Sequence, residues 1–462
     1  MLRRFIGDKA FYRRTFAIAL PIILQNLITN FVSLLDNVMV GQLDTAQISA
    51  VTIVNNNLLF VFMLCMFGGA AGAGIFTTQF YGSGDNEGIR YTFRFKILIS
   101  LLLTGLGAAL FYFGGDALIG LYLQGDGDPE VAAQTLFYGR KYMRIMLIGL
   151  LPFALTNAYA GTLRECGHPT VPMLAGLAAT VVNIVFNYIL IFGKFGAPAL
   201  GVAGAAIATV ISRYAELAIV AFWTHLHAKK CPYVKGLYSG FHIPGKLFKS
   251  IVLRGLPLLF NECLWSVGMA VLNQSYSYCG LDVVPALSIA FTVYNLASVV
   301  YHSLGNVVGI ITGQMLGACR PEEEVKDQNR KLTALCTMSG VVFGLVGICL
   351  SGVFPRLYNT TDSVRQLATA MIFIMSAIMP FPAYTFPVYF TLRSGGKTLL
   401  TFLFDCGSVW FITIPLAFCL SRFTQFPILL IFFLCNATDI TKAFIGYLVV
   451  RRGDWIQNLT DK

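Results

Sequence analysis

The chain has 462 residues, of which 56% are hydrophobic and only 12% are charged, and its formal net charge is +11. Soluble domains carry about 25% charged residues, so this composition excludes an ordinary soluble protein. The positive balance does not indicate nucleic-acid binding, because the Lys and Arg residues gather in loops on one predicted side of a membrane.

Long apolar segments recur along the whole chain and predict twelve transmembrane helices. A helix needs about 20 apolar residues to cross the hydrocarbon core, and each segment reaches that length. Backbone groups in lipid must be paired within helices or a closed barrel, and segments without strict alternation exclude the barrel. The fold class is therefore an all-α integral membrane protein. The predicted spans are 16–40, 48–80, 93–113, 133–158, 170–192, 202–226, 250–278, 284–315, 331–354, 366–391, 398–420 and 425–449.

The distribution of basic residues predicts that both termini lie in the cytoplasm. When the N-terminus is taken as inside, most loop cations fall on that side, among them Arg94 and Lys96 at the start of the third span. The other side receives few, such as Arg140 and Lys194. The positive-inside rule therefore predicts a multi-pass protein of the cell membrane with cytoplasmic termini.

A carboxylate lies inside the first apolar segment, where Asp36 precedes Asn37. A charged side chain in hydrocarbon costs several kcal/mol unless water or a partner meets it, so such residues usually mark an ion, proton or substrate pathway. A satisfied structural Asp near a helix end is the alternative.

Three polar residues of the fifth and sixth spans are expected at the same depth as Asp36. Counted from the loops at about 1.5 Å per residue, Asn183, Asn187 and Thr209 fall in the outer half of the membrane. Asn183 and Asn187 are four residues apart and share a helix face. Together the four residues form an oxygen-rich set of the kind that hard cations such as Na⁺ prefer. Asn side chains that only cross-link helices are the alternative.

The chain divides into two halves that repeat each other. The longest cytoplasmic break separates six spans from six, which predicts an N-terminal six-helix lobe (1–226), a cytoplasmic linker (227–249) and a C-terminal six-helix lobe (250–462). Segment 74–82 recurs as 309–317 with five identities in nine. A six-span unit returns to its starting side, so we expect two parallel bundles related by a pseudo-twofold axis along the membrane normal. Two bundles around a central site are typical of an alternating-access transporter.

The second half has its own acidic residues. Glu262 is expected near the midplane of the seventh span, as a substrate or second proton site or as a structural residue. Asp405 in the eleventh span is expected to be structural, paired with Arg393 or Lys397. Two further pairs at a spacing of three residues are expected to be local ion pairs, namely Arg213 with Glu216 and Asp439 with Lys442.

Prolines within the spans are expected to interrupt helices and free carbonyl groups. They are interpreted as bend points for rocking or as fixed kinks. The residues concerned are Pro21, Pro257, Pro380 and Pro382.

Signatures of other chemistries are absent from the sequence. The 11 cysteines form no C-x-x-C pair and the 5 histidines do not cluster, so neither a disulfide framework nor a zinc site is indicated. Segment 396–398 has the end of a P-loop without its earlier glycine. We therefore expect no ATP site, no enzyme activity, no cofactor other than a coupling Na⁺ or H⁺, and no metal other than Na⁺ at Asp36.

Several stretches of the chain match the motifs of one transporter family, namely 35–43, 79–82, 183–193, 201–209 and 256–262. Through them the chain resembles the multidrug and toxic compound extrusion (MATE) family of the MOP flippase superfamily over nearly its whole length. The resemblance implies secondary active efflux of amphipathic, often cationic compounds, driven by Na⁺ or H⁺, with a cation site at Asp36, Asn183, Asn187 and Thr209. Some members have Asp at the position of Asn187, and some pair the acid at Glu262 with a second acid on the tenth helix, which this chain lacks.

The predicted function is therefore a multidrug efflux antiporter that works as a monomer in the lipid membrane on small organic substrates. A flippase of a lipid-linked sugar or other lipid is the first alternative, and it would need several basic residues in its cavity. A membrane-embedded enzyme is the second, and it would need His, Asp or Ser side chains clustered at one depth.

Overall fold

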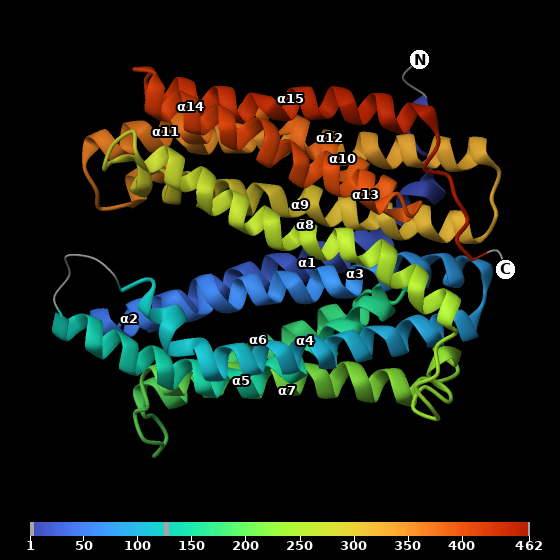
Figure 1. The fold of residues 1–462 in the computed structure, drawn as a ribbon, viewed down its shortest axis with the longest axis horizontal. Coiled ribbons are helices and arrows are strands. Elements are labelled where there is room, and N and C mark those ends of the chain that lie inside the picture. The colour runs from blue at the N-terminus through green and yellow to red at the C-terminus, as the bar shows by residue number, and fades with distance from the viewer. Residues whose placement is uncertain (1–3, 124–128, 461–462) are drawn as a thin grey trace. The chain divides into compact units, whose positions relative to one another are not determined.

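The computed structural model describes residues 4–123 and 129–460, and this part of the chain forms helices and no strand (Figure 1). The predicted all-α class is confirmed. Shorter π-helical segments span Thr52–Leu59, Leu403–Gly407 and Val409–Thr413. The α-helices are α1 (Lys9–Val40), α2 (Thr45–Val51), α3 (Phe60–Ser83), α4 (Asn86–Gly120), α5 (Pro129–Glu165), α6 (Thr170–Phe192), α7 (Val202–Leu226), α8 (Gly245–Ser277), α9 (Val283–Gly317), α10 (Glu322–Ser351), α11 (Asp362–Ile378), α12 (Pro380–Ser394), α13 (Thr398–Phe402), α14 (Ile414–Phe423) and α15 (Ile428–Arg452).

Within the described residues, eleven helical segments are long and apolar enough to cross a membrane, and α11 with α12 adds a twelfth if this bent pair is one span. These segments coincide with the twelve predicted spans. The bend of 50° falls at Pro380, which lacks an N–H group to continue the helix. Pro21 and Pro257, in contrast, lie inside α1 and α8, so the expected interruption is wrong at both. Pro382 lies inside α12 and does not interrupt it either.

Helix ends follow from local chemistry. Asp85 precedes α4, and its Oδ1 accepts hydrogen bonds of 2.9 Å from the backbone N–H groups of Glu87 and Gly88. These groups have no partner within the helix, so the carboxylate caps its N-terminus. At the C-terminus of α6, Gly193 adopts a left-handed φ of 66°, which glycine enters without steric cost, and the helix ends there.

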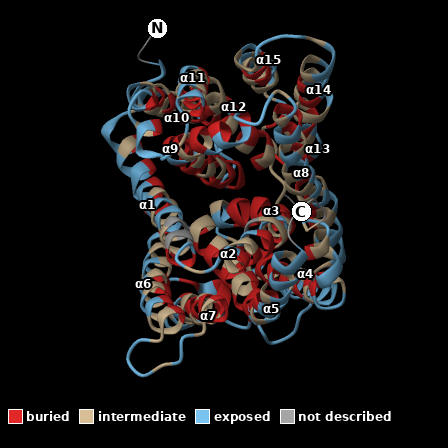
Figure 2. Cartoon of the chain, turned by 90° about the vertical axis from the view of Figure 1, so that its left-hand side faces the viewer, coloured by how far each residue is buried: buried red, intermediate tan, exposed pale blue. Residues whose placement is uncertain are grey.

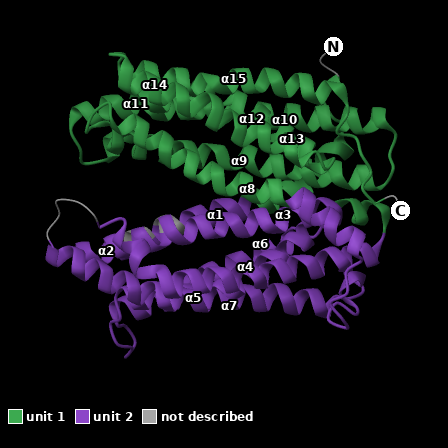
Figure 3. Cartoon of the chain, in the orientation of Figure 1, with its two compact units in different colours: residues 1–23, 78–84, 256–462 green, residues 24–77, 85–255 purple. Residues whose placement is uncertain are grey.

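The chain forms two compact units. Unit 1 contains residues 1–23, 78–84 and 256–462, and unit 2 contains residues 24–77 and 85–255 (Figure 3). Each unit buries its own apolar side chains among its own helices (Figure 2). This division into units does not test the predicted boundaries of the two lobes and the linker, which stay a prediction.

The segment expected as a linker belongs to unit 2 and packs against its helix α4. Arg94 is buried and donates hydrogen bonds to the carbonyl oxygens of Leu237 at 2.8 Å, Gly236 at 2.6 Å and His242 at 3.0 Å. Arg94 is therefore a buried residue that stabilises a folded loop, and its predicted cytoplasmic side stays a prediction.

The two copies of the sequence repeat contact each other inside unit 1. A β-carbon on Gly82 would overlap the carbonyl oxygen of Gln314, and one on Gly317 would overlap the carbonyl oxygen of Gln79. Gly82 and Gln79 correspond to Gly317 and Gln314 in the repeat, so each copy places its glycine on the glutamine of the other. This reciprocity is the property of an isologous contact between symmetric partners. Both positions therefore require glycine, because the backbone of the other copy lies where a β-carbon would be.

Gln79 also holds the end of the chain. Its Nε2 donates to the carbonyl oxygens of Ser394 at 2.9 Å and Gln457 at 3.1 Å, and its Oε1 accepts from the backbone N–H of Leu459 at 2.7 Å. The buried amide of Gln79 is satisfied on both sides, and the segment after α15 is fixed to unit 1 through its backbone.

Candidate cation site

The four residues predicted to form a cation site lie together in unit 2. Asp36 is on α1, Asn183 and Asn187 are on α6, and Thr209 is on α7. Asn187 Nδ2 donates to Asp36 Oδ1 at 2.7 Å and to Asn183 Oδ1 at 3.0 Å. Asn183 Nδ2 contacts Thr209 Oγ1 at 3.5 Å. The predicted convergence is therefore observed, while the binding of a cation stays a prediction.

The sequence of α6 explains why both asparagines face inward. Its buried residues recur every three or four positions, which defines one helix face, and the residues on that face other than the two asparagines are apolar. Asn183 is 4% and Asn187 2% exposed. Polar side chains buried on an apolar face must find partners within the protein. They meet Asp36 and Thr209, so the four side chains form one network, which we call the Asp36 network.

One oxygen of the Asp36 network has no partner. An ionised carboxylate only accepts hydrogen bonds, so Asp36 requires the NH₂ end of the Asn187 amide to face it. Asn187 Oδ1 is then turned away, and no donor in the described part of the chain reaches this buried atom. An unsatisfied buried acceptor costs about 1–3 kcal/mol.

The Asp36 network fits a small hard cation. The carboxylate of Asp36, the amide oxygen of Asn187 and the hydroxyl of Thr209 are oxygen ligands of the kind that such ions prefer. A cation or a protonated water at Asn187 Oδ1 would satisfy the open acceptor of this network. The donor set contains no nitrogen or sulfur ligand, so it is unsuited to zinc or copper.

Two neighbours of Asp36 escaped the sequence analysis as members of the site. Tyr142 on α5 is buried in the same apolar cluster as Met39, three residues after Asp36. Arg213 on α7 has its Cζ 4.5 Å from the ring centroid of Phe153, and its expected local ion pair with Glu216 is not formed in the described part of the chain. Arg213 follows Thr209 by four residues, and this spacing was the signal available in the sequence.

A second polar cluster lies in unit 1. Lys442 Nζ lies 2.6 Å from Asp405 Oδ1, and Asn261 Nδ2 donates to Asp405 Oδ2 at 3.1 Å. The structural interpretation of Asp405 has this geometric support, and its ion-pair partner is Lys442, where a partner such as Arg393 or Lys397 was expected. Lys442 likewise makes its ion pair with Asp405 on another helix, whereas a local pair with Asp439 was expected.

Glu262 stands beside this cluster. Its carboxylate interacts electrostatically with Arg393 and with Asp405. Asn261 Oδ1 is a buried acceptor that no donor in the described residues reaches. Asp405 lies in the π-helical segment Leu403–Gly407, a type of distortion that is frequent at functional sites. The surroundings are compatible with the substrate-site and the structural interpretation of Glu262 alike.

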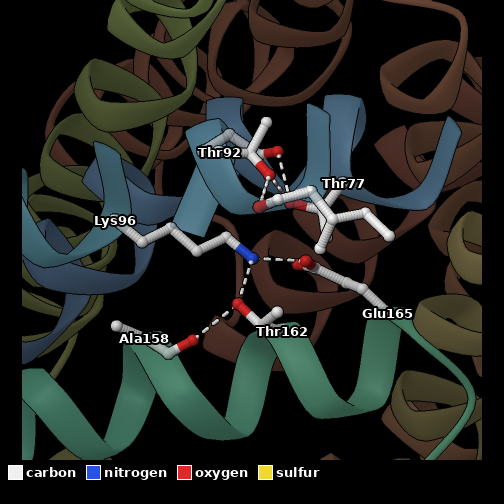
Figure 4. A network of polar contacts seen from close by, with 8 residues as sticks. Thr77, Thr92, Lys96, Ala158, Thr162 and Glu165 are labelled. Atoms are coloured by element: carbon white, nitrogen blue, oxygen red, sulfur yellow. Dashed lines mark hydrogen bonds and ion pairs between the residues drawn. The ribbon is translucent and has the colours of Figure 1, made fainter. Parts of the chain in front are cut away.

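A third polar group is structural. Lys96 is 1% exposed, forms an ion pair with Glu165 and donates to Thr162 Oγ1 at 3.2 Å (Figure 4). The hydroxyls of Thr77 and Thr92 are hydrogen-bonded beside it at 2.9 Å. The predicted cytoplasmic side of Lys96 stays a prediction, and its ammonium group is buried between α4 and α5.

Apart from the candidate cation site, the described residues offer no further metal site. Among residues 4–123 and 129–460, no three His, Cys, Asp or Glu side chains are arranged to hold a metal ion. No disulfide joins the cysteines of the described residues.

The family model described as MatE matches residues 21–189 and 257–419 of this chain. The probable multidrug resistance protein NorM of Thermotoga maritima is 22% identical over 440 residues, which cover 95% of this chain and 92% of the relative. The probable multidrug resistance protein YoeA of Bacillus subtilis is 25% identical in an alignment that covers 88% of this chain and 87% of the relative. The multidrug resistance protein PmpM of Pseudomonas aeruginosa is 25% identical over 91% of this chain and 86% of its own.

Solved structures share the fold. The outward-facing conformation of a multidrug resistance MATE family transporter of the MOP superfamily matches with a TM-score of 0.86 at 18% identity, over 98% of both chains. A MOP superfamily transporter from Pyrococcus furiosus matches with a TM-score of 0.84 at 18% identity, again over 98% of both chains.

Proposed function

The chain belongs to the MatE family, a family of membrane transporters rather than enzymes, and from that premise we propose that it is a multidrug efflux antiporter. In this proposal the protein exports organic, cationic amphipathic compounds and takes up Na⁺ or H⁺ in exchange. Asp36, Asn183, Asn187 and Thr209 bind the coupling ion, and the two six-helix lobes alternate access to it.

The observation that carries the proposal is the Asp36 network with its open acceptor. Asp36 provides charge in a membrane-spanning helix, and Asn187 Oδ1 is a second buried oxygen without a donor in the described part of the chain. Buried polar groups are normally satisfied, so the open acceptor beside Asp36 supports an ion-binding role for this network. An ion that enters and leaves accounts for both features.

Coupling follows if ion and substrate favour different states of the transporter. In the outward-facing state Asp36 takes the cation, α1 shifts, and the affinity for the substrate falls. The substrate leaves outward, the lobes change their access, and the ion is released to the cytoplasm. A coupling free energy of about 1–3 kcal/mol between the two sites is enough for this exchange.

The charge balance of unit 1 favours a cationic substrate. Glu262, Asp405 and Asp439 face Lys442 and Arg393 there, so three carboxylates meet two cations. Neither Glu262 nor Asp439 forms a direct ion pair in the described part of the chain, and we propose Glu262 as a substrate contact or second proton site. The relatives named multidrug resistance proteins point to the same substrate class.

The lipid flippase is the weaker candidate. A pyrophosphate-linked cargo needs uncompensated basic residues, whereas the buried Lys96 of unit 2 is paired with Glu165. We also propose that both termini face the cytoplasm and that the protein works as a monomer.

Transport in liposomes tests the proposal. Purified protein is reconstituted, and uptake of a fluorescent organic cation is followed under an imposed Na⁺ gradient and, separately, an imposed pH gradient. We expect one gradient to drive transport and Asp36→Asn to abolish it. Asp116→Asn is the matched control, because Asp116 is an exposed carboxylate of the same unit, 2.6 Å from Arg140. Gradient-driven transport that persists in Asp36→Asn contradicts the proposal.

A further inference from the structure

We propose that segment 453–460, which follows α15, is a releasable strap: it locks the end of α3 onto unit 1, and its outer part must leave before access can change. The inference rests on the proposed function, because only a transporter with alternating access has a change of access to lock. Residues 453–455 are called the root of the strap and residues 457–460 its tip. The strap is the red coil that leads from α15 to the C mark in Figure 1.

The root of the strap is fixed by a buried aromatic side chain. Trp455 is 1% exposed, belongs to an apolar core cluster of unit 1, and donates from Nε1 to the carbonyl oxygen of Val450 at 3.0 Å. Its backbone carbonyl lies where a β-carbon would be on Gly395, so the strap passes directly over the residue that follows α12. A buried aromatic side chain removes a large apolar area from water, so the root stays in place when polar contacts elsewhere break.

The tip of the strap is held by hydrogen bonds that water can replace. Gln79 Nε2 donates to the carbonyl oxygen of Gln457 at 3.1 Å, and Gln79 Oε1 accepts from the backbone N–H of Leu459 at 2.7 Å. Asn458 Nδ2 lies 3.0 Å from the Sγ of Cys319, just after α9. The residues of the tip are only half-buried, so breaking these bonds exchanges them for bonds to water at a small net cost.

The residue that the tip holds lies where α3 passes from one unit to the other. Residues 60–77 of α3 belong to unit 2 and residues 78–83 to unit 1. Gln79 is 0% exposed, and its Nε2 also donates to the carbonyl oxygen of Ser394 at the end of α12, at 2.9 Å. The strap and α12 therefore hold α3 by its first turn inside unit 1. Because α3 is continuous, a rearrangement of the two units has to act on this turn.

The two glutamines of the repeat hold different partners. Gln314, the counterpart of Gln79, accepts through Oε1 from Arg14 Nη2 at 3.3 Å, and Arg14 belongs to the helix α1. Gln79 holds backbone groups of the strap, which is not helical beyond α15. The tip can therefore leave Gln79 without unwinding a helix, as expected of a part that opens and closes.

A permanent anchor is the alternative to a releasable strap, and the two differ in one consequence. An anchor keeps the same contacts in every state, so fixing its tip covalently would leave transport unchanged. A strap has to free its tip in each cycle, so fixing the tip stops transport although the fold is intact. Local opening of a polar, half-buried segment beside a buried root is also visible in amide hydrogen exchange.

A reversible cross-link tests the strap. Asn458→Cys places a second thiol beside the native Cys319, and a short bifunctional methanethiosulfonate reagent joins the two in full-length protein that carries Cys349→Ser and Cys419→Ser, so that the other two exposed thiols are absent. Uptake of ethidium, as the fluorescent organic cation, is measured in liposomes before cross-linking, after it and after reduction. We expect uptake to fall to the level of empty liposomes after cross-linking and to return on reduction. The matched control has the same background with Asn458 retained, and it should keep its uptake.

The outcomes separate the strap from the proposed function. Unchanged uptake in protein whose 319–458 cross-link is verified by mass spectrometry overturns the strap and leaves the antiporter standing, and so does a loss of equal size in the control. Two thiols that fail to cross-link contradict the contact of the tip. If the wild type moves no organic cation under either gradient, the proposed function fails and the change of access that the strap would lock fails with it.

Hydrogen–deuterium exchange of the wild type decides if Asn458→Cys does not fold. We expect the amides of the tip to exchange much faster than those of the last two turns of α15, while the root stays protected. A tip as slow as α15 would overturn the strap.

Discussion

The ion pair of Lys96 and Glu165 provides a sharp test of the packing in unit 2. Lys96 is 1% exposed and Glu165 18%, so the ammonium is fully buried and the carboxylate is reached in part by water. Removing one partner of a buried pair costs about 3–5 kcal/mol, because the other charge is left uncompensated. Glu165→Gln strands the ammonium and should cost about 4 kcal/mol of unfolding free energy. Lys96→Met strands the more accessible carboxylate and should cost about half of that.

The surroundings explain why the pair cannot relax easily. A β-carbon on Gly74 would lie 2.5 Å from Glu165 Oε1, so α3 leaves room for the carboxylate and no more. Thr162 Oγ1 accepts from Lys96 Nζ at 3.2 Å and cannot replace a negative charge. The double variant Lys96→Met with Glu165→Met removes both charges and should recover most of the loss.

The assay is the unfolding free energy from SDS titration of the purified protein, followed by circular dichroism. Asp116→Asn is the control, because it breaks a pair at 2.6 Å whose side chains are 54% and 44% exposed, and exposed pairs contribute about 0–1 kcal/mol. Glu165→Gln that is no more destabilising than Asp116→Asn would refute the reasoning. So would a double variant less stable than either single one.

Three further predictions concern other parts of the chain. Gly317→Ala places a β-carbon on a backbone carbonyl of α3 and should cost about 1–3 kcal/mol in the same SDS titration, whereas Gly105→Ala, where nothing lies within 4 Å, should be neutral or stabilising. Lys442→Met should lower the thermal midpoint more than Lys442→Met combined with Asp405→Asn, since only the single variant leaves the Asp405 carboxylate without its ion-pair partner; equal midpoints would contradict the pairing. Burial lowers the pKa of His168, in the turn after α5, below its usual value of 6.5, so the unfolded chain binds more protons just below pH 6.5 and stability falls as the pH drops from 7 through this range. His168→Gln should flatten this part of the stability profile, and an unchanged slope would exclude His168 as its source.

The Asp36 network could be predicted because the sequence indicates the depth of each residue in the membrane and the helix face on which it lies. Loop positions and a rise of about 1.5 Å per residue placed Asp36 and Thr209 at one level, and a spacing of four residues put Asn183 and Asn187 on one face. The hydrogen bonds of 2.7 and 3.0 Å then follow from the burial of polar groups that need partners. The direction in which the Asn187 amide points, and hence its open oxygen, needed coordinates.

The pairings in unit 1 and at Lys96 could not be predicted in the same way. Lys442 lies three residues after Asp439, but its ion pair is with Asp405, 37 residues earlier, because packing of neighbouring helices brings those side chains together. Lys96 lies at the start of the third apolar span, and its position in the sequence alone suggests a cation near a loop. Only the approach of α5 with Glu165 shows that it is buried. Sequence spacing describes one helix at a time, and these contacts join two.

The central claim is that ion and substrate movement are coupled through Asp36, and reciprocity gives the most direct test. Coupled exchange must run in reverse, so a substrate gradient alone should move the ion against its own gradient. In liposomes loaded with an organic cation and held without an ion gradient, we expect substrate efflux to drive Na⁺ or H⁺ inward, recorded by an ion-sensitive dye. Asp36→Asn should abolish this ion flux and Asp116→Asn should preserve it. Substrate efflux without ion movement in the wild type, or ion movement that survives Asp36→Asn, would contradict the account.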